Sequence, residues 1–171
     1  MTEVMQPVPE SILSQTTDFQ TEPIDARFRT ALAEKFGIED EKTAGALRRE
    51  ALRYLAMCAA YPGREIPMFS ELVDEYWHTF ILFTKDYFAF CRALGMPYIH
   101  HEPAGDDVAE EGPSYAEFCS LYEQAFQQPL PEVWNLRFNK ESRTCYSIAD
   151  KKCGNCKGGC NNCCSRACKY A

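Results

Sequence analysis

The segment ELVDEYWHTFILFTKDYFAFCRALG, residues 71–95, decides which fold this chain can adopt. On a helical wheel at about 100° per residue, its polar side chains gather on one side and aromatic or aliphatic side chains cover the rest. The polar stripe consists of Glu71, Asp74, Glu75, His78, Lys85, Asp86 and Arg92, interrupted by Leu82 and Ala89. A helix with so much apolar surface must pack against other helices, so the sequence predicts a central helix over 71–94.

Both ends of this helix carry boundary signals. Ser70 is a suitable N-cap, and Glu71 and Asp74 suit the positive end of the helix dipole. Gly95 and Pro97 end the helix. His78 lies in the middle of the polar stripe, one helical turn after Asp74.

Three other segments share the helical period. The first runs from Ile24 to Phe36 and ends at Gly37, and the second follows it and ends at YPG, residues 61–63. The third begins at Ser114, which forms an S-x-x-E capping box with Glu117. The apolar positions are Ile24, Phe28, Ala31, Leu32 and Phe36; Leu47, Ala51, Tyr54, Leu55 and Cys58; and Tyr115, Phe118, Cys119, Tyr122 and Phe126.

No run of alternating residues predicts a multi-stranded sheet, so the expected fold is all-α, a small bundle of about four main helices. We expect a helical domain over 23–140, in which QQPLPEVWN lays Trp134 against the bundle as an extended segment. Residues 1–22 are polar and contain Pro7 and Pro9, which predicts disorder. A cysteine-rich tail, residues 145–171, follows the domain.

Length and charge limit the functions open to the chain. Its 171 residues, 46% hydrophobic, can bury one core. The net charge of −7 divides into −12 over residues 1–150 and +5 over residues 151–171. Because nucleic-acid affinity comes mainly from neutralised phosphates, the acidic body argues against a nucleic-acid partner. No run reaches the roughly 18 apolar residues of a membrane span, and the first 20 residues lack the pattern of a secretory signal. We therefore expect a cytoplasmic protein with reduced thiols and no membrane association.

All three histidines fall near the polar stripe. Asp74 and His78 are spaced i, i+4 and can share a metal ion. His100 and His101 belong to the loop that leaves the helix, and if this loop folds back, either one could complete the site together with a carboxylate such as Glu102. The alternative is a solvated helix face with a surface pair of histidines in a loop.

The same region resembles a known family. VDEYWHTFILFTKDYFAFC followed by IHHEP is similar to the D-x-x-W-H…Y…H-x-[DE] pattern of the glycine-rich-domain-protein-like family of bacteria and plants, over about residues 24–135. The resemblance implies a small helical domain that groups Asp74, Trp77, His78, Tyr87 and the His100–His101 pair, but it implies no reaction. The chain departs from the family in having only nine glycines and a cysteine cluster in place of a glycine-rich extension.

Seven of the ten cysteines lie in the tail, and six of them form the pattern C-x2-C-x3-C-x2-C-C-x3-C. These six are Cys153, Cys156, Cys160, Cys163, Cys164 and Cys168. Small and polar spacers cannot build a core, so a folded tail would need its thiols. A zinc ribbon separates its two C-x2-C turns by on the order of 12 residues or more, whereas here three residues intervene. A thiolate cluster for several Zn²⁺ or Cu⁺ ions fits this spacing better.

Other interpretations of the tail stay open. An iron–sulfur cluster is one, although the radical-SAM spacing C-x3-C-x2-C has too little chain after it for the barrel. Thiol redox chemistry is another, because neighbouring Lys and Arg lower thiol pKa values. A disordered tail or a disulfide knot are the remaining ones. The other three cysteines, Cys58, Cys91 and Cys119, fall on apolar helix faces and are expected in the core.

The sequence therefore predicts a cytoplasmic metal-binding protein, more consistent with a binding role than with an enzyme. Zinc is the expected ion, with copper(I) or an iron–sulfur cluster as alternatives. A second hypothesis is a metal-dependent enzyme centred on Asp74, His78, His100 and His101, in which a metal-bound water reacts. A third is an interaction module whose tail is a redox or modification handle for a protein partner.

Overall fold

The computed structural model describes residues 5–101, 114–139, 141–142 and 144–147. Over these residues the chain is mostly helical, which confirms the all-α class. The α-helices are α1 (Glu10–Asp18), α2 (Glu22–Ala31), α3 (Glu41–Ala60), α4 (Glu71–Leu82), α5 (Thr84–Ala93) and α6 (Tyr115–Phe126). A π-helical turn, η1 (Leu32–Phe36), extends α2, and a 3₁₀ turn, η2 (Glu132–Asn135), precedes a hairpin of β1 (Leu136–Asn139) and β2 (Thr144–Ser147).

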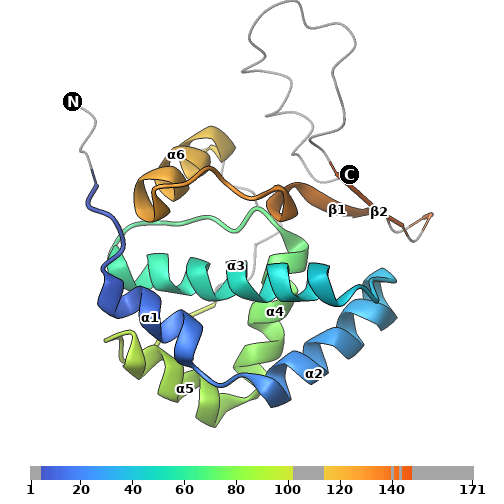
Figure 1. Cartoon of the computed structure of the whole chain (residues 1–171), viewed down its shortest axis with the longest axis horizontal. Coiled ribbons are helices and arrows are strands. Elements are labelled where there is room, and N and C mark those ends of the chain that lie inside the picture. The colour runs from blue at the N-terminus through green and yellow to red at the C-terminus, as the bar shows by residue number, and fades with distance from the viewer. Residues whose placement is uncertain (1–4, 102–113, 140, 143, 148–171) are drawn as a thin grey trace, which may run out of the picture.

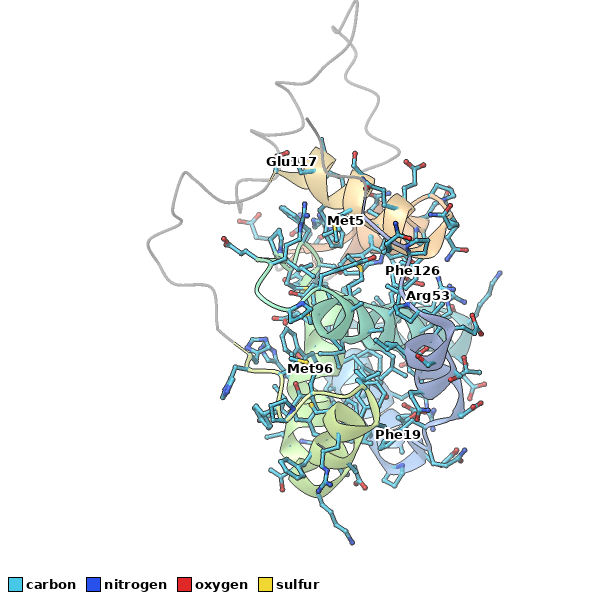
Figure 2. The ribbon with its side chains drawn as sticks, turned by 90° about the vertical axis from the view of Figure 1, so that its left-hand side faces the viewer. Met5, Phe19, Arg53, Met96, Glu117 and Phe126 are labelled. Atoms are coloured by element: carbon cyan, nitrogen blue, oxygen red, sulfur yellow. The ribbon has the colours of Figure 1, made fainter. Side chains whose placement is uncertain are left out.

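The longest helix, α3, runs across the middle of the domain, and α4 crosses it (Figure 1). Helices α1, α2 and α5 lie on one side of α3, and α6 lies on the other side together with η2 and the hairpin. In the side view, Phe19 lies near the α5 end of the domain, while Arg53 and Phe126 lie together under α6 (Figure 2). The Arg53 guanidinium is 5.3 Å from the Phe126 ring centre, which helps to hold α6 on α3.

The prediction of disorder for residues 1–22 is wrong for the described residues of that segment. Helix α1 forms there because Ile12 and Leu13 pack on the core and Val8 is buried. The Val8 N–H donates to the Ala125 carbonyl of α6 at 2.9 Å, which anchors the segment across the bundle. Polar composition and prolines masked this short apolar face, and Pro9 in fact occupies the N-cap of the helix.

The single helix predicted over 71–94 is two helices. The chain breaks at Phe83, whose φ of −88° and ψ of 64° are not helical. The Phe83 N–H donates to the Phe80 carbonyl at 2.9 Å, so the break leaves this group satisfied. In a straight helix Phe80 and Phe90 would be about 15 Å apart along the axis, yet their ring centres are 5.4 Å apart. The break thus lets one apolar segment cover two sides of the core, and it raises the number of helices above the four predicted.

The predicted helix boundaries at capping residues are confirmed. The Ser70 hydroxyl accepts from the Val73 N–H, and Ser114 and Glu117 form the complete capping box. Gly37 ends η1 with φ of 67°, and Gly95 follows α5 with φ of 83°, a backbone conformation that favours glycine.

One carboxylate lies inside the core. The Glu50 side chain on α3 is fully buried and accepts hydrogen bonds from the Tyr122 hydroxyl and from Trp134 Nε1, the latter at 3.0 Å. Arg49 and Arg53 contact its other oxygen at 3.1 and 3.4 Å. This Glu50 cluster joins α3, α6 and η2, and Trp134 is buried there as expected, although in a 3₁₀ turn and not in an extended segment.

The hairpin moves the predicted tail boundary. Strands β1 and β2 pair antiparallel, with Phe138 opposite Cys145 and Leu136 opposite Ser147. Residues 145–147, assigned to the tail, therefore belong to the hairpin. The six closely spaced cysteines of the tail lie outside the described residues. None of the helices in the described part of the chain combines the length and apolar character needed to cross a membrane.

A candidate metal centre on helix α4

Helix α4 presents Asp74 and His78 on the same face. They are one helical turn apart, and Asp74 Oδ2 lies 3.4 Å from His78 Nε2. The helix begins two residues before Val73, whose N–H is capped by Ser70, so the first turn that carries Asp74 is held in place. The arrangement follows directly from the i, i+4 geometry that the sequence predicts.

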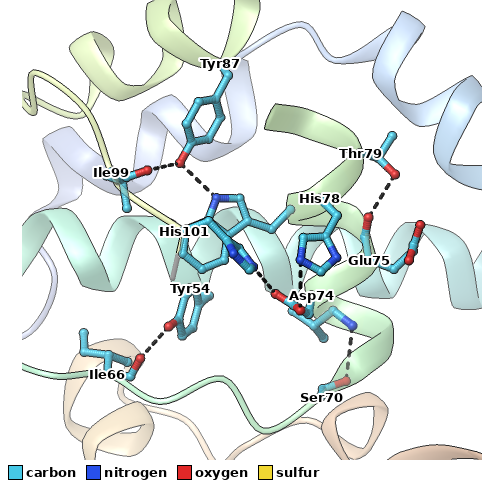
Figure 3. A network of polar contacts seen from close by, with 12 residues as sticks. Tyr54, Ile66, Ser70, Asp74, Glu75, His78, Thr79, Tyr87, Ile99 and His101 are labelled. Carbon is cyan, nitrogen blue, oxygen red and sulfur yellow. Dashed lines mark hydrogen bonds and ion pairs between the residues drawn. The ribbon is translucent and has the colours of Figure 1, made fainter. Parts of the chain in front are cut away.

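His101 reaches the same carboxylate from a distant part of the sequence. Its Nε2 lies 2.8 Å from Asp74 Oδ1, although the two residues are 27 positions apart. One carboxylate oxygen thus faces each histidine, and the two imidazole centres are 4.4 Å apart (Figure 3). The His101 ring also packs edge-on against Trp77 at 4.4 Å, which fixes its orientation.

A buried hydrogen-bond chain holds the loop that carries His101. Trp77 Nε1 donates to the Tyr87 hydroxyl at 2.9 Å, and this hydroxyl donates to the Ile99 carbonyl at 2.6 Å. The chain connects α4, α5 and the return loop two residues before His101 (Figure 3). Burial raises the pKa of Tyr87 well above its ordinary value, so the hydroxyl keeps its proton and can donate to Ile99.

Ligand atoms of Asp74, His78 and His101 all lie within 4.8 Å of one another. One carboxylate oxygen and two imidazole nitrogens form a donor set that suits zinc and similar transition metals. The same nitrogens face the carboxylate directly, so an ion about 2.0–2.2 Å from each ligand would replace these contacts with coordination bonds. The exposed fractions of the side chains are 12% for His101, 23% for Asp74 and 49% for His78, so the group is shielded on the His101 side and open on the His78 side.

Not every predicted ligand joins this group. His100 is exposed and its ring lies 4.9 Å from that of Tyr98, so it is not part of the cluster. Glu102 and the six tail cysteines lie outside the described residues. The prediction that the loop folds back along the helix is matched by the position of His101.

An open depression adjoins the exposed side of the cluster. Asp74 and His78 line it, together with Glu34, Lys35, Phe36, Glu71, Glu75 and Phe138. Lys35 Nζ lies 2.7 Å from Glu75 Oε1, and four carboxylates outnumber this one ammonium group. We call it the acidic depression. Sequence reasoning missed Lys35 and Phe138, because only tertiary packing brings η1 and β1 beside α4.

The cysteines of the described helices are not part of the site. Cys91 is buried, as expected, and Cys58 and Cys119 are partly buried. Burial raises the pKa of Cys58 to about 12 and also raises the pKa of Cys91 and Cys119. A thiol held in its protonated form is a poor nucleophile and a poor metal ligand. Cys91 in the core and Cys58 packed against it fit the predicted packing role, whereas Cys119 is only partly buried.

Comparison with known proteins gives one match. The family described as UCP032817-like matches residues 15–111, which include α2 to α5 and all three residues of the cluster. No curated protein matches the chain. No solved structure matches it either. Because the match spans more than half of the 171 residues, the chain belongs to the UCP032817-like family.

Proposed function

We propose that this protein binds a divalent transition-metal ion, zinc in the first place, through Asp74, His78 and His101. The observation that carries the proposal is that three ligand atoms from α4 and a distant loop converge within 4.8 Å. An aspartate and a histidine one turn apart on a helix, as Asp74 and His78 are, form a frequent coincidence. A third ligand supplied from 27 residues away is a stronger argument for a built site.

The surroundings of the cluster support this assignment. Metal-binding histidines are usually held by further contacts that fix the ring, and loss of such contacts lowers metal affinity. Here the Trp77 ring packs on His101, and the Trp77–Tyr87–Ile99 hydrogen bonds fix the loop beside it. Two imidazoles and a carboxylate favour zinc over the hard ions Mg²⁺ and Ca²⁺, which take oxygen ligands.

The tail belongs to the same proposal as a second set of ligands. Its six cysteines, from Cys153 to Cys168, would hold zinc or copper(I) as a thiolate cluster in a cytoplasmic, reducing setting. The relationship to the glycine-rich-domain-protein-like family is likewise a proposal. Of the residues that carry it, Asp74, Trp77, His78 and His101 lie in or against the cluster.

The test is a zinc titration of the purified full-length chain in competition with a chromophoric chelator. All six tail cysteines are replaced by serine in one background, the tail-Ser variant, to isolate the helical site. We expect one zinc equivalent in this background and its loss in Asp74→Asn, His78→Ala and His101→Ala. Affinity should fall as the pH is lowered, because protons compete with zinc for the same imidazole nitrogens.

His100→Ala is the matched control, since it removes a neighbouring histidine that is outside the cluster. It should bind zinc like its parent. Equal zinc binding by the tail-Ser variant and its His78→Ala derivative would refute the helical site. If the wild-type chain binds zinc and the tail-Ser variant binds none, the tail is the metal site.

The opening of the cluster favours a second function, a metal-dependent hydrolytic enzyme. Three protein ligands leave a fourth position, and His78 lies at the acidic depression where a water-bearing ion would be accessible. The zinc-loaded full chain would be assayed on activated esters and phosphoesters. Turnover that is lost in Asp74→Asn would support the enzyme, and rates no higher than those of Asp74→Asn would exclude it for these substrates.

A further inference from the structure

We propose that Glu75 is the general base of a zinc-dependent amide hydrolase whose substrates are peptides with a basic side chain near the cleaved bond. The inference rests on the proposed metal site at Asp74, His78 and His101, and it deepens the hydrolytic function proposed for that site. It assigns a catalytic role to a buried carboxylate that is not one of the three ligands.

Residues 74–78, DEYWH, place three polar side chains in a fixed order around α4. At about 100° per residue, His78 lies about 40° from Asp74 around the helix axis, and Glu75 lies about 60° further in the same direction. Figure 3 accordingly shows Glu75 on the opposite side of His78 from His101. A glutamate directly after the first of two helical ligands at i and i+4 is also how zinc peptidases hold their general base, in the pattern H-E-x-x-H.

The open side of the metal cluster is the side on which Glu75 lies. An external molecule reaches the ion past His78, because that side chain is 49% exposed and His101 is only 12% exposed. Glu75 lines the acidic depression together with Asp74 and His78. A water in the fourth position of this site would therefore lie beside the Glu75 carboxylate. Two imidazoles and one carboxylate are, in addition, a ligand set found in catalytic zinc sites of peptidases.

The Glu75 carboxylate is shielded from solvent but not saturated with donors as Glu50 is. Its side chain is 11% exposed, and Lys35 Nζ of η1 contacts Oε1 at 2.7 Å. Glu50, by contrast, has donors on both of its oxygens. Oε2 of Glu75 is then the atom that accepts a proton. Lys35 is a positioning residue that orients the carboxylate through Oε1.

The reaction is a balanced hydrolysis. Glu75 accepts a proton from a water at the open side of the cluster, and the oxygen of this water forms a bond to the carbonyl carbon of the amide. The carbon–nitrogen bond then breaks, and Glu75 passes the proton to the leaving nitrogen. A bound zinc ion polarises the carbonyl oxygen. The products are a carboxylic acid and an amine, so the step consumes one water and needs no oxidant or reductant.

The walls of the depression favour a peptide with a basic side chain. The volume is about 520 Å³, within the range of pockets that hold small ligands. Phe36 and Phe138 form an apolar wall, with ring centres 5.2 Å apart and ring planes at 86°. Glu34 and Glu71 lie on the same walls. Their negative charges attract a lysine or arginine of the substrate and disfavour a phosphoester.

The experiment uses the zinc-loaded tail-Ser variant, which isolates the helical site. Two sets of internally quenched peptides are the probes, one rich in lysine and one rich in glutamate, and mass spectrometry identifies the cleaved bonds. We expect kcat/KM for the lysine-rich set to be about tenfold higher at low salt, with a smaller ratio at high salt. His101→Ala, which removes a ligand, should abolish turnover, and this excludes a contaminating peptidase.

Glu75→Gln is the decisive variant, because it keeps the size of the side chain and removes the base. Its kcat should fall about 10²- to 10⁴-fold with little change in KM. Its zinc affinity should change by less than about fivefold, which also shows that it is folded. Glu75→Asp keeps a carboxylate and should retain more activity than Glu75→Gln. Glu123→Gln, at an exposed carboxylate on α6, is the matched control and should leave kcat and zinc affinity unchanged.

A second pair of variants tests the positioning role of Lys35. Lys35→Met should lower kcat about 10- to 100-fold, because the Glu75 carboxylate is no longer oriented. Lys35→Arg keeps a cation that can reach Oε1 and should restore most of the activity. If the ion pair only joins η1 to α4, both variants would keep the parental kcat in their folded, zinc-loaded form.

The outcomes separate this inference from the metal site on which it rests. Equal kcat in Glu75→Gln and its parent would overturn the role of Glu75 as base, and so would a joint loss of zinc and of the fold. A parent that holds one zinc and cleaves neither peptide set would overturn the hydrolase and leave the metal site intact. Preference for the glutamate-rich set would overturn the substrate class. Absence of zinc from the parent would reject the metal site and the inference together.

Discussion

Glu50 and Asp74 each lie at the centre of a polar cluster, and the partners of these two carboxylates differ in kind. Glu50 is fully buried, and all its partners are donors: two guanidinium groups, a tyrosine hydroxyl and an indole N–H. Asp74 is partly exposed, and its partners are two imidazoles, which can either donate a proton or bind a metal ion. The Glu50 cluster is saturated by the protein itself, whereas the proposed metal site would exchange the internal contacts of Asp74 for an ion.

This contrast separates a carboxylate with a structural role from the carboxylate of the proposed metal site. A buried charge that is satisfied on every side stabilises one arrangement of α3, α6 and η2 and offers nothing to a ligand. A carboxylate that contacts two imidazoles at the edge of an acidic depression still has ligand atoms that an ion could reach. Mutations at the two centres should therefore affect different measurements.

The largest effect is expected for Glu50→Ala. It leaves Tyr122 and Trp134 with buried donors and two arginines without their common partner, which should lower the free energy of unfolding by about 3–5 kcal/mol. Urea unfolding of the metal-free protein measures this loss. Glu123→Ala, an exposed carboxylate on α6, should change stability by less than about 0.5 kcal/mol. A similar small change for Glu50→Ala would mean that the cluster is not structural.

Tyr87→Phe should affect both stability and binding. Removing the hydroxyl leaves Trp77 Nε1 and the Ile99 carbonyl unpaired in the core, at a cost of about 1–3 kcal/mol. Because the same hydrogen bonds hold the loop of His101, zinc affinity in the tail-Ser background should also fall about 10- to 100-fold. Tyr98→Phe, in the same loop, is the control and should preserve affinity. Unchanged affinity in Tyr87→Phe would show that the loop needs no such support.

Asp74→Asn should have little effect on the metal-free fold. It weakens two partly exposed contacts, so the free energy of unfolding should fall by about 1 kcal/mol or less. The difference appears with zinc: in the tail-Ser background, free zinc at 100 times its dissociation constant should stabilise the parent by about 2.7 kcal/mol and leave Asp74→Asn unaffected. Thermal melts with and without zinc measure this, and a zinc-dependent shift in the variant would contradict the assignment.

The smallest effect is expected for His100→Ala. The residue is exposed and lies outside the cluster, so stability should change by less than about 0.5 kcal/mol and zinc binding should not change. Calorimetric zinc titrations of His100→Ala and His101→Ala, run side by side, compare the zinc affinities of variants at two adjacent histidines. Equal losses in both variants would mean that the loop is arranged differently in the metal-bound protein.

Local signals predict part of this molecule. The i, i+4 pair of Asp74 and His78 and the caps at Ser70 and Ser114 depend on a few neighbouring residues, and the structure has all of them. No glycine or proline marks the helix break at Phe83 in the sequence. The break arises because the apolar faces of α4 and α5 pack on two sides of the core. The sequence also does not show which of His100 and His101 contacts Asp74, because this depends on how the Tyr87 hydroxyl holds the loop at Ile99.

The Glu50 cluster was missed for the same reason. Arg49, Glu50 and Arg53 look like an exposed, charged helix surface when only neighbouring residues are considered. Their burial depends on Tyr122 and Trp134, which are 72 and 84 residues further along the chain. A helical wheel shows only residues within one helix, so it does not show contacts between residues this far apart in the sequence.

If the proposed metal site is correct, the break at Phe83 makes metal binding a measure of complete folding. Had residues 71–94 remained one straight helix, Trp77 and Tyr87 would lie about 15 Å apart along the axis. Their hydrogen bond, and with it the support of the return loop at Ile99, could then not form, and His101 would not be held at Asp74. A partly folded chain with α4 formed but α5 undocked therefore has two ligands and no site. Zinc affinity should appear only when α5 has folded back, and the rate at which a refolding chain gains its ion would time that docking step.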